Sequence, residues 1–398
     1  MKKYLSIKRI CHFITWWSVY WRWEILYKLL HPVMPVDSKT VCVISWYGRF
    51  FNCNPAAIAS YLSNHNKIGL KIVAIVDDPA QYEKYYPNIH FVKVKSLGHL
   101  KAQLSCKVFI SNVRMAEFDK KPGQIYIQTW HGMGPKKSEK DSCDTLTELY
   151  VQKAIKDCNQ TDLMISGSKW QTEWIKKSTW YTGDILEVGT PRDDCFFHKN
   201  EYKERRKRVY TTYRINHDKK LILYAPTFRS ACEIAQNSID VDALIKACSA
   251  KFGQEYVLLL RLHPNVAGKP LPEIYAKHIS KKVFNATLYP DMQDLLCASD
   301  VLITDFSSVS TEFVMQDKPC FLYIPDYKSY DRGLYFKPEE MPFPYSFDDR
   351  QLVETVRDFN FNIYLQEVHS YKNTIGMCEN GASCAKVQDF IEKKILTS

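Results

Sequence analysis

The sequence predicts an α/β protein made of two doubly wound domains, with parallel sheets covered by helices on both faces. Three observations carry this prediction. From residue 36 onward, short apolar runs alternate with segments of helical pattern, as expected for parallel strands joined by helices. The alternation occurs twice, with a basic segment between the two series. A length of 398 residues with 45% hydrophobic content suits two cores. We expect ligands in a cleft between the domains.

Residues 1–35 differ from the rest and are predicted to form a membrane-associating segment. A basic start is followed by residues 13–30, which hold four Trp and two Tyr but also Arg22, Glu24 and Lys28. This stretch is too charged for a spanning helix, which needs about 20 apolar residues. It also has no small-residue cleavage site of a signal peptide. Trp, Tyr and basic residues favour a helix lying on an anionic membrane surface. The alternative is an amphipathic helix packed on the protein's own domain or on a partner.

Residues 36–198 are predicted to form the first domain. Each expected strand is a short apolar run, and the strand at 123–128 leads directly into Thr129-Trp130-His131-Gly132. The expected strands are 40–45, 71–76, 91–94, 107–110, 123–128, 163–166 and 187–190, and the expected helices are 55–63, 97–104, 146–158 and 169–176.

A basic helix at 201–214 is expected between the halves. It holds Lys203, Arg205, Arg206, Lys207 and Arg208. Such a charge run is typical of a solvated helix, and contact with anionic lipid or polymer is the functional alternative.

Residues 199–375 are predicted to form the second domain, and residues 376–398 a C-terminal helix packing towards the first domain. The stretch 297–326 is a strand–turn–helix–strand unit, in which Ser307 and Ser308 begin the helix. Serines at a helix N-terminus suit a phosphate, and ordinary capping is the alternative. The expected strands are 220–224, 256–262, 283–285, 301–304 and 320–324, and the expected helices are 241–250, 292–298, 352–359 and 383–397, the last capped by Ser383.

Charge and cysteine usage narrow the classes of function. A net charge of +10 suits an anionic partner, but no zinc-finger, basic-zipper or RNA-binding motif is present, so nucleic acid is not expected. The 13 cysteines are scattered without a CxxC pair, which favours reduced thiols. Neither zinc-ligand spacing nor a carboxylate cluster for magnesium is seen, so no metal and no cofactor are predicted.

Polar side chains follow the carboxyl ends of several expected strands. They are His131, Arg192, Arg229, His263 and the turn from Asp305 to Ser308. Because binding sites of open α/β sheets lie at that edge, we expect these residues to face one site. Each of them taken alone is as compatible with a structural role.

The motifs at these positions resemble one family. GQIYIQTWHGMGPKK, VGTPRDD, LYAPTFR, LRLHP and ASDVLITDFSSVSTEF occur in this order, followed by YDRGLYF and Glu379-Asn380-Gly381. Together they resemble the CDP-glycerol glycerophosphotransferase family of teichoic-acid primases and polymerases, from about residue 40 to the C-terminus. Met133-Gly134-Pro135 and Phe228 depart from the usual pattern of this family, which leaves the polyol and the acceptor open.

The resemblance implies a GT-B-like fold in which residues 36–198 form the acceptor-side domain and residues 199–375 bind a CDP-polyol donor. The implied reaction transfers glycerol phosphate, or a related polyol phosphate, to a membrane-linked saccharide or polymer and releases CMP, in teichoic acid or capsule-like polymer synthesis. The implied location is peripheral, at the cytoplasmic face of the bacterial plasma membrane. Two alternatives stay open: a GT-B glycosyltransferase using a nucleotide sugar, and a non-catalytic membrane scaffold of the same pathway.

The reaction assigns expected roles to the motif residues. His131 is the expected general base for the acceptor hydroxyl, and His263 is expected to hydrogen-bond the pyrophosphate or protonate the leaving phosphate. Cations and serines meet the charge that develops on CMP, with Lys136 and Lys137 as further candidates. Asp305 would hold a hydroxyl or orient another side chain, and Glu312 would bind the ribose or lie on the surface. The predicted substrate-binding set is Arg192, Thr227, Arg229, Arg261, Asp305, Ser307, Ser308 and Glu312.

Overall fold

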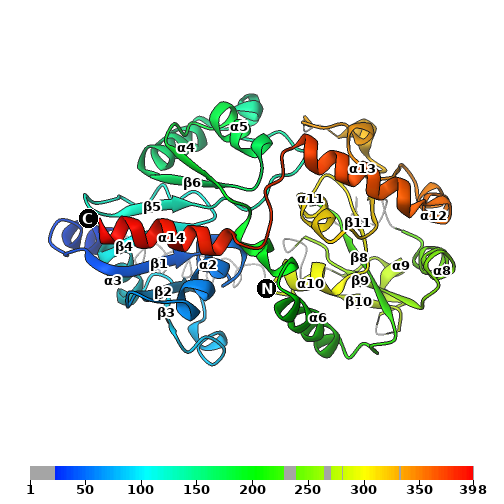
Figure 1. The fold of residues 1–398 in the computed structure, drawn as a ribbon, viewed down its shortest axis with the longest axis horizontal. Helices are drawn as coiled ribbons and strands as arrows, with labels where there is room; N and C mark the ends of the chain where they lie inside the picture. Colours follow the sequence, from blue (N-terminus) through cyan, green and yellow to red (C-terminus); the bar gives the residue numbers. More distant parts are fainter. Residues whose placement is uncertain (1–22, 228–238, 264–269, 280, 331–332, 398) are drawn as a thin grey trace, which may run out of the picture. The chain divides into compact units, whose positions relative to one another are not determined.

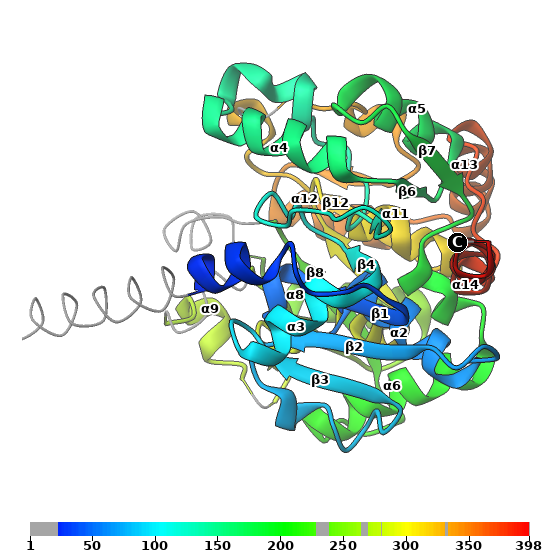
Figure 2. The same ribbon diagram turned by 90° about the vertical axis from the view of Figure 1, so that its left-hand side faces the viewer.

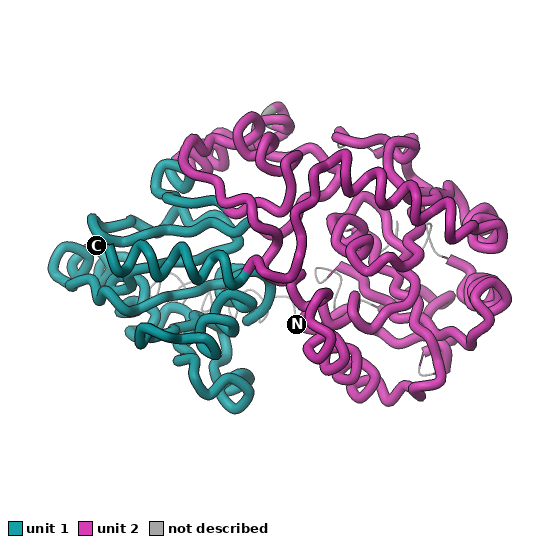
Figure 3. Tube along the Cα trace, in the orientation of Figure 1, with its two compact units in different colours: residues 1–130, 156–164, 384–398 teal, residues 131–155, 165–383 magenta. Residues whose placement is uncertain are grey.

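The computed structural model describes residues 23–227, 239–263, 270–279, 281–330 and 333–397. By contacts between residues, the chain divides into two compact units (Figure 3). Unit 1 comprises residues 1–130, 156–164 and 384–398, and unit 2 comprises residues 131–155 and 165–383.

The first sheet has seven strands in the order β3-β2-β1-β4-β5-β6-β7 (Figure 1). β1 pairs in parallel with both β2 and β4, as predicted for a doubly wound domain. The apolar runs fill its core, where Val41, Phe109 and Ile110 are fully buried. The strands are β1 (Asp37–Ile44), β2 (Lys71–Val76), β3 (Ile89–Lys93), β4 (Cys106–Ser111), β5 (Ile125–Gln128), β6 (Leu163–Ser166) and β7 (Asp184–Glu187).

Helices α2 (Cys53–Asn64), α3 (Leu97–Ser105) and α14 (Ser383–Leu396) belong to unit 1 for all or nearly all of their length. Ser96 caps α3 by accepting a hydrogen bond from the backbone N–H of His99. α14 lies along one face of the sheet (Figure 1), and Gln388 donates to the carbonyl of His65 at the end of α2.

Residues 23–30 form a short helix that packs on unit 1. Tyr27, only 5% exposed, contacts Leu100 and Leu104, and its hydroxyl accepts from the backbone N–H of Asp119. Figure 2 shows this helix, in dark blue, beside α3. Ile25 and Leu29 are exposed on the same helix. One face of residues 23–30 therefore packs on the protein's own domain, as the alternative to a membrane-associated helix predicted. Residues 1–22 lie outside the described part.

The second sheet has six strands in the order β10-β9-β8-β11-β12-β13, all paired in parallel. Its apolar strands form the core of unit 2 with the helices that cover them. The strands are β8 (Lys220–Ala225), β9 (Tyr256–Leu260), β10 (Val283–Asn285), β11 (Val301–Thr304), β12 (Cys320–Tyr323) and β13 (Tyr345–Ser346).

The helices between and after these strands were predicted with two omissions, α9 and α13. They are α4 (Glu148–Gln160), which begins in unit 2 and ends in unit 1, α5 (Lys169–Ser178), α6 (Lys199–Tyr213), α8 (Val241–Phe252), α9 (Glu273–Ala276), α10 (Met292–Ala298), α11 (Val309–Phe313), α12 (Asp349–Asp358) and α13 (Phe361–Thr374).

The two sheets follow the predicted change of domain, because β7 ends at Glu187 and β8 begins at Lys220. The compact units divide the chain elsewhere, since they place residues 131–155 and 165–198 in unit 2. The predicted residue boundaries therefore remain a prediction. Among the described residues, no helix has the length and apolar character needed to cross a bilayer.

The solvated interpretation of the basic helix is wrong for two of its arginines. Arg205 on α6 is 15% exposed and lies 2.8 Å from both Asp291 and Asp294. Arg206 donates to Asp300 at 3.1 Å. These guanidinium groups form ion pairs with acidic residues at the start of α10 and before β11. Both arginines of α6 therefore have a structural role.

Candidate active site

The loop after β5 carries His131 and lies against the turn that holds Ser308. A Cβ added to Gly132 would stand 2.7 Å from Nη2 of Arg192 and 2.8 Å from Oγ of Ser308. A Cβ on Gly134 would stand 3.1 Å from the backbone nitrogen of Ser308. All of these residues belong to unit 2, so the structure brings the two motifs together.

The far end of this loop is held by backbone contacts. The N–H of Lys137 donates to the carbonyl of Gly333 at 2.8 Å, and the N–H of Tyr335 donates to the carbonyl of Pro135. Lys136 forms an isolated antiparallel bridge with Leu334. The loop that follows His131 is therefore anchored on residues 333–335 as well as on the serine turn.

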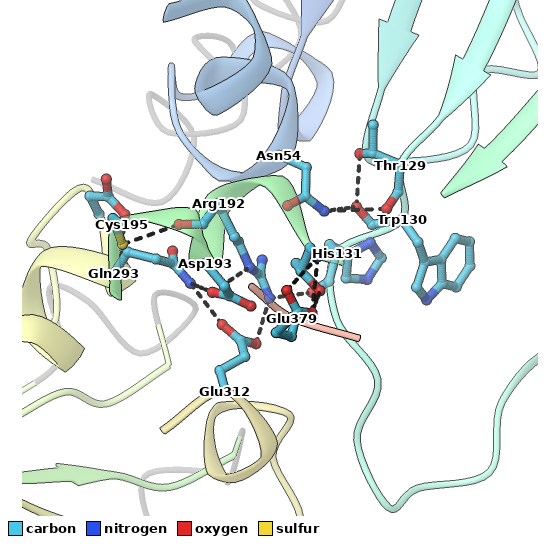
Figure 4. Close-up of polar contacts among 12 residues, drawn as sticks. Asn54, Thr129, Trp130, His131, Arg192, Asp193, Cys195, Gln293, Glu312 and Glu379 are labelled. Carbon is cyan, nitrogen blue, oxygen red and sulfur yellow. Dashed lines mark hydrogen bonds and ion pairs between the residues drawn. The ribbon is translucent and has the colours of Figure 1, made fainter. Parts of the chain in front are cut away.

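Arg192 and Glu312 form a buried ion pair beneath the loop (Figure 4). Nη2 of Arg192 lies 2.5 Å from Oε1 of Glu312 and donates to the carbonyl of His131 at 3.0 Å. Glu312 is 4% exposed, so the alternative of a surface glutamate is wrong. Gln293 donates from Nε2 to Oε2 of Glu312 and to Asp193.

Asp305 and Thr227 meet because β8 and β11 are neighbours that end at the same level. Ala225 pairs with Thr304, so the residues that follow each strand lie side by side. Asp305 accepts from the N–H of Thr227 at 2.9 Å and from its hydroxyl at 2.6 Å. The carboxylate thus holds the start of the β8 loop; Arg229, farther along that loop, lies outside the described residues.

Arg261 and His263 follow β9. Nη1 of Arg261 donates to the backbone carbonyls of Ala286, Thr287 and Tyr289, which gives this side chain a structural role. Its phosphate-binding role stays a prediction. Burial lowers the pKa of His263, and the positive charges of Arg261 and Lys136 lower that pKa further. The imidazole of His263 is therefore neutral at pH 7.

The serine turn leads into a helix that is shorter than its sequence suggests. α11 spans Val309–Phe313 and continues as a 3₁₀ turn. Ser308 occupies the N-cap position, but its side chain makes no capping hydrogen bond, which argues against the ordinary-capping interpretation for this residue. With only five residues in the helix, a phosphate here would be met mainly by hydroxyl and backbone N–H groups.

Three side chains around the Arg192–Glu312 ion pair were not predicted from the sequence: Asp193, Gln293 and Glu379. Glu379 accepts from the N–H and the hydroxyl of Thr190, two residues before Arg192. Burial raises the pKa of Glu379 to about 7. Burial also raises the pKa of Asp193, and the neighbouring charge of Glu312 adds to that shift. The available signal was the position of Asp193 and Glu379 inside the VGTPRDD and Glu379-Asn380-Gly381 motifs.

No group of three or more His, Cys, Asp or Glu side chains suited to a metal ion occurs in the part of the chain that the structure describes. Among the described residues, Arg192 lies against the His131 loop, and the charges of Arg261 and Lys136 act on His263.

Comparisons with known proteins agree on one family. Residues 26–393 match the family described as CDP-Glycerol:Poly(glycerophosphate) glycerophosphotransferase. The chain is 28% identical to the teichoic acid poly(glycerol phosphate) polymerase of Bacillus spizizenii, covering 92% of this chain and 94% of that protein. It is 28% identical to the teichoic acid glycerol-phosphate transferase of Staphylococcus aureus, covering 94% and 97%.

Among solved structures, a variant of the wall teichoic acid polymerase TagF soaked with CDPG is similar over 94% of this chain and 93% of that one. The TM-score is 0.81 and the sequence identity is 25%. This likeness confirms the predicted GT-B-like class with two Rossmann-like sheets. The chain belongs to the CDP-Glycerol:Poly(glycerophosphate) glycerophosphotransferase family.

Proposed function

We propose that the chain transfers glycerol phosphate from CDP-glycerol to a growing or newly primed teichoic acid, releasing CMP. Family membership supports the reaction class, and the similar enzymes act in teichoic acid synthesis by their names. The structural observation that carries the proposal is the seating of the His131 loop on the Ser308 turn within unit 2. The loop that carries the candidate base therefore lies against the candidate phosphate-binding turn.

In the proposed reaction, a hydroxyl of the acceptor attacks the phosphorus that bears glycerol. The new P–O bond forms as the bond to the phosphate of CMP breaks, and the proton of the attacking hydroxyl passes to the imidazole of His131. Negative charge develops on the departing CMP. The Ser307–Ser308 turn and nearby cationic side chains would stabilise this charge.

His263 is proposed to hydrogen-bond the pyrophosphate of the donor. Its pKa lies below the ordinary value because of burial and nearby positive charge, so the free enzyme presents a neutral ring with one N–H donor. A bound pyrophosphate adds negative charge beside the ring and favours its protonation. The same side chain could then give a proton to the leaving phosphate.

A panel of donors tests the proposed reaction. The enzyme is mixed with a lipid-like acceptor and, separately, with CDP-glycerol, CDP-ribitol or UDP-sugars, and CMP release and product mass are measured. We expect CMP release and a mass increase of one or more polyol phosphate units with a CDP-polyol. Turnover of a UDP-sugar without turnover of a CDP-polyol would instead support the sugar transferase. Calorimetry that detects neither CMP nor CDP binding would support the scaffold.

We also propose that the acceptor is lipid-linked and that the enzyme works peripherally at the cytoplasmic face of the membrane. The aromatic and basic composition of residues 1–22 supports membrane contact, and so does the exposure of Ile25, Leu29 and Val33 beyond them.

Deleting residues 1–22 is expected to release the protein from anionic vesicles without unfolding it. The deletion should stop before Trp23, because Tyr27 packs in the core of unit 1. Sedimentation with phosphatidylglycerol vesicles measures binding, and the melting temperature checks the fold. Unchanged sedimentation of the shortened protein would show that the anchoring lies elsewhere.

A further inference from the structure

We propose that the Arg192–Glu312 pair positions the catalytic loop and does not itself bind the donor. In this inference, which rests on the proposed role of His131, the pair fixes the backbone of His131 and Gly132 and thereby aims the imidazole. Arg192 and Glu312 were both expected from sequence to contact substrate. Their surroundings in unit 2 give them the different task of holding this loop.

Both carboxylate oxygens of Glu312 already have hydrogen-bond partners inside the protein. Oε1 meets Nη2 of Arg192 at 2.5 Å, and Oε2 accepts from Nε2 of Gln293 at 2.7 Å. Glu312 is 4% exposed. A ribose hydroxyl would have to reach a carboxylate that is buried and already hydrogen-bonded on both oxygens, which argues against a direct contact with the donor.

Arg192 connects the pair to the loop. The same Nη2 that meets Glu312 also donates to the carbonyl of His131 at 3.0 Å (Figure 4). Its side chain is buried as well, with 9% of the residue exposed. Because an arginine fork has a fixed geometry, orienting it with Glu312 fixes the direction of its bond to the loop carbonyl.

Gly132 completes the contact. Its φ of +109° lies in the region that favours glycine. A Cβ at this position would meet Arg192 at 2.7 Å, Ser308 at 2.8 Å and Glu312 at 3.1 Å. The loop can therefore lie directly on the ion pair only because residue 132 has no side chain.

Two variants test the inference while Arg192 itself stays in place. Glu312→Gln keeps the size of the side chain but removes the ion pair, and Gly132→Ala pushes the loop off the pair. For both variants we expect kcat to fall about tenfold to a hundredfold, as a misplaced reacting group would cause. We expect KM for CDP-glycerol and the calorimetric affinity for CMP to stay within about twofold, because donor contacts are unchanged.

Hydrogen exchange gives a readout that does not depend on turnover. The backbone amides of residues 131–137 are expected to exchange faster in both variants than in the wild-type protein. Arg205→Gln is the matched control. It removes the ion pairs of another largely buried arginine of unit 2, which lies on α6 and contacts Asp291 and Asp294. This control should lower the melting temperature while leaving kcat and the exchange of residues 131–137 unchanged.

Two results would overturn the inference. A tenfold rise in KM with kcat intact and CMP affinity lost would assign the pair to donor binding. Unchanged kcat and unchanged exchange in both variants would show that the loop does not depend on the pair. If the wild-type enzyme releases no CMP from CDP-glycerol, the proposed function fails, and the exchange comparison alone still decides whether the pair holds the loop.

Discussion

Replacing His131 by alanine is expected to lower kcat for CMP release by about 10²- to 10⁴-fold, the usual contribution of a general base. The acceptor hydroxyl is a poor nucleophile until its proton is removed, and the loop after β5, which carries His131, lies against the serine turn. KM for CDP-glycerol should change little, because the proposed partner of His131 is the acceptor. Steady-state CMP release with varied donor concentration measures both constants.

His369→Ala is the control for this experiment. His369 lies on α13 in unit 2, and its side chain is 59% exposed beside Asp317. Its loss should leave kcat and KM unchanged. Activity that survives His131→Ala but disappears in His263→Ala would move the role of base to His263, and activity that survives both would remove histidine from the proton transfer.

The sequence predicts most strands of both sheets because these strands are short apolar runs bounded by polar residues. β10 and β11, for example, begin and end at the predicted residues. β7 is displaced by three residues from the predicted 187–190, since Gly189, with a φ of +105°, turns the chain there. α13 was missed because aromatic and β-branched residues obscure its pattern. Asn360, which caps the helix with its side chain, and the buried Tyr364, Val368 and Tyr371 were the available signal.

The site was predicted only as a set of residues at strand ends. Parallel pairing explains why Thr227 and Asp305 meet, and this could be inferred from the order of strands. The placement of the His131 loop on the serine turn could not be inferred from the sequence. It depends on the conformation of Gly132 and on the bridge between residues 136 and 334. The buried carboxylates escaped prediction for a related reason: a local pattern does not reveal that Asp193 and Glu379 are enclosed by segments distant in the chain.

One of these carboxylates makes the stability of the protein depend on pH. Burial raises the pKa of Glu379 to about 7 from an ordinary value of 4.5. The folded protein therefore binds the proton more tightly than the unfolded chain does. The resulting stabilisation is fully present below pH 4.5 and is lost as the pH rises to about 7. The free energy of unfolding lost over this range is about 3 kcal/mol.

Glu379→Gln is expected to remove this dependence. The amide is uncharged at every pH, and its oxygen can still accept from the N–H and hydroxyl of Thr190. Between pH 5 and 8, the free energy of unfolding should fall by about 2–3 kcal/mol more in the wild-type protein than in the variant. Urea unfolding at several pH values measures this difference, with the exposed Glu173→Gln as the control that keeps the wild-type slope.

The same variant connects stability with the catalytic loop. Glu379 holds Thr190, and Arg192, two residues later, holds the carbonyl of His131. Ionisation of Glu379 places a charge in a buried environment that already contains Asp194 and Glu312, so this segment should loosen as the pH rises above 7. Glu379→Gln should therefore retain a larger fraction of its pH 7 activity at pH 8.5 than the wild-type enzyme retains. An identical decline in both proteins, together with identical unfolding slopes, would show that Glu379 is already ionised in the folded state.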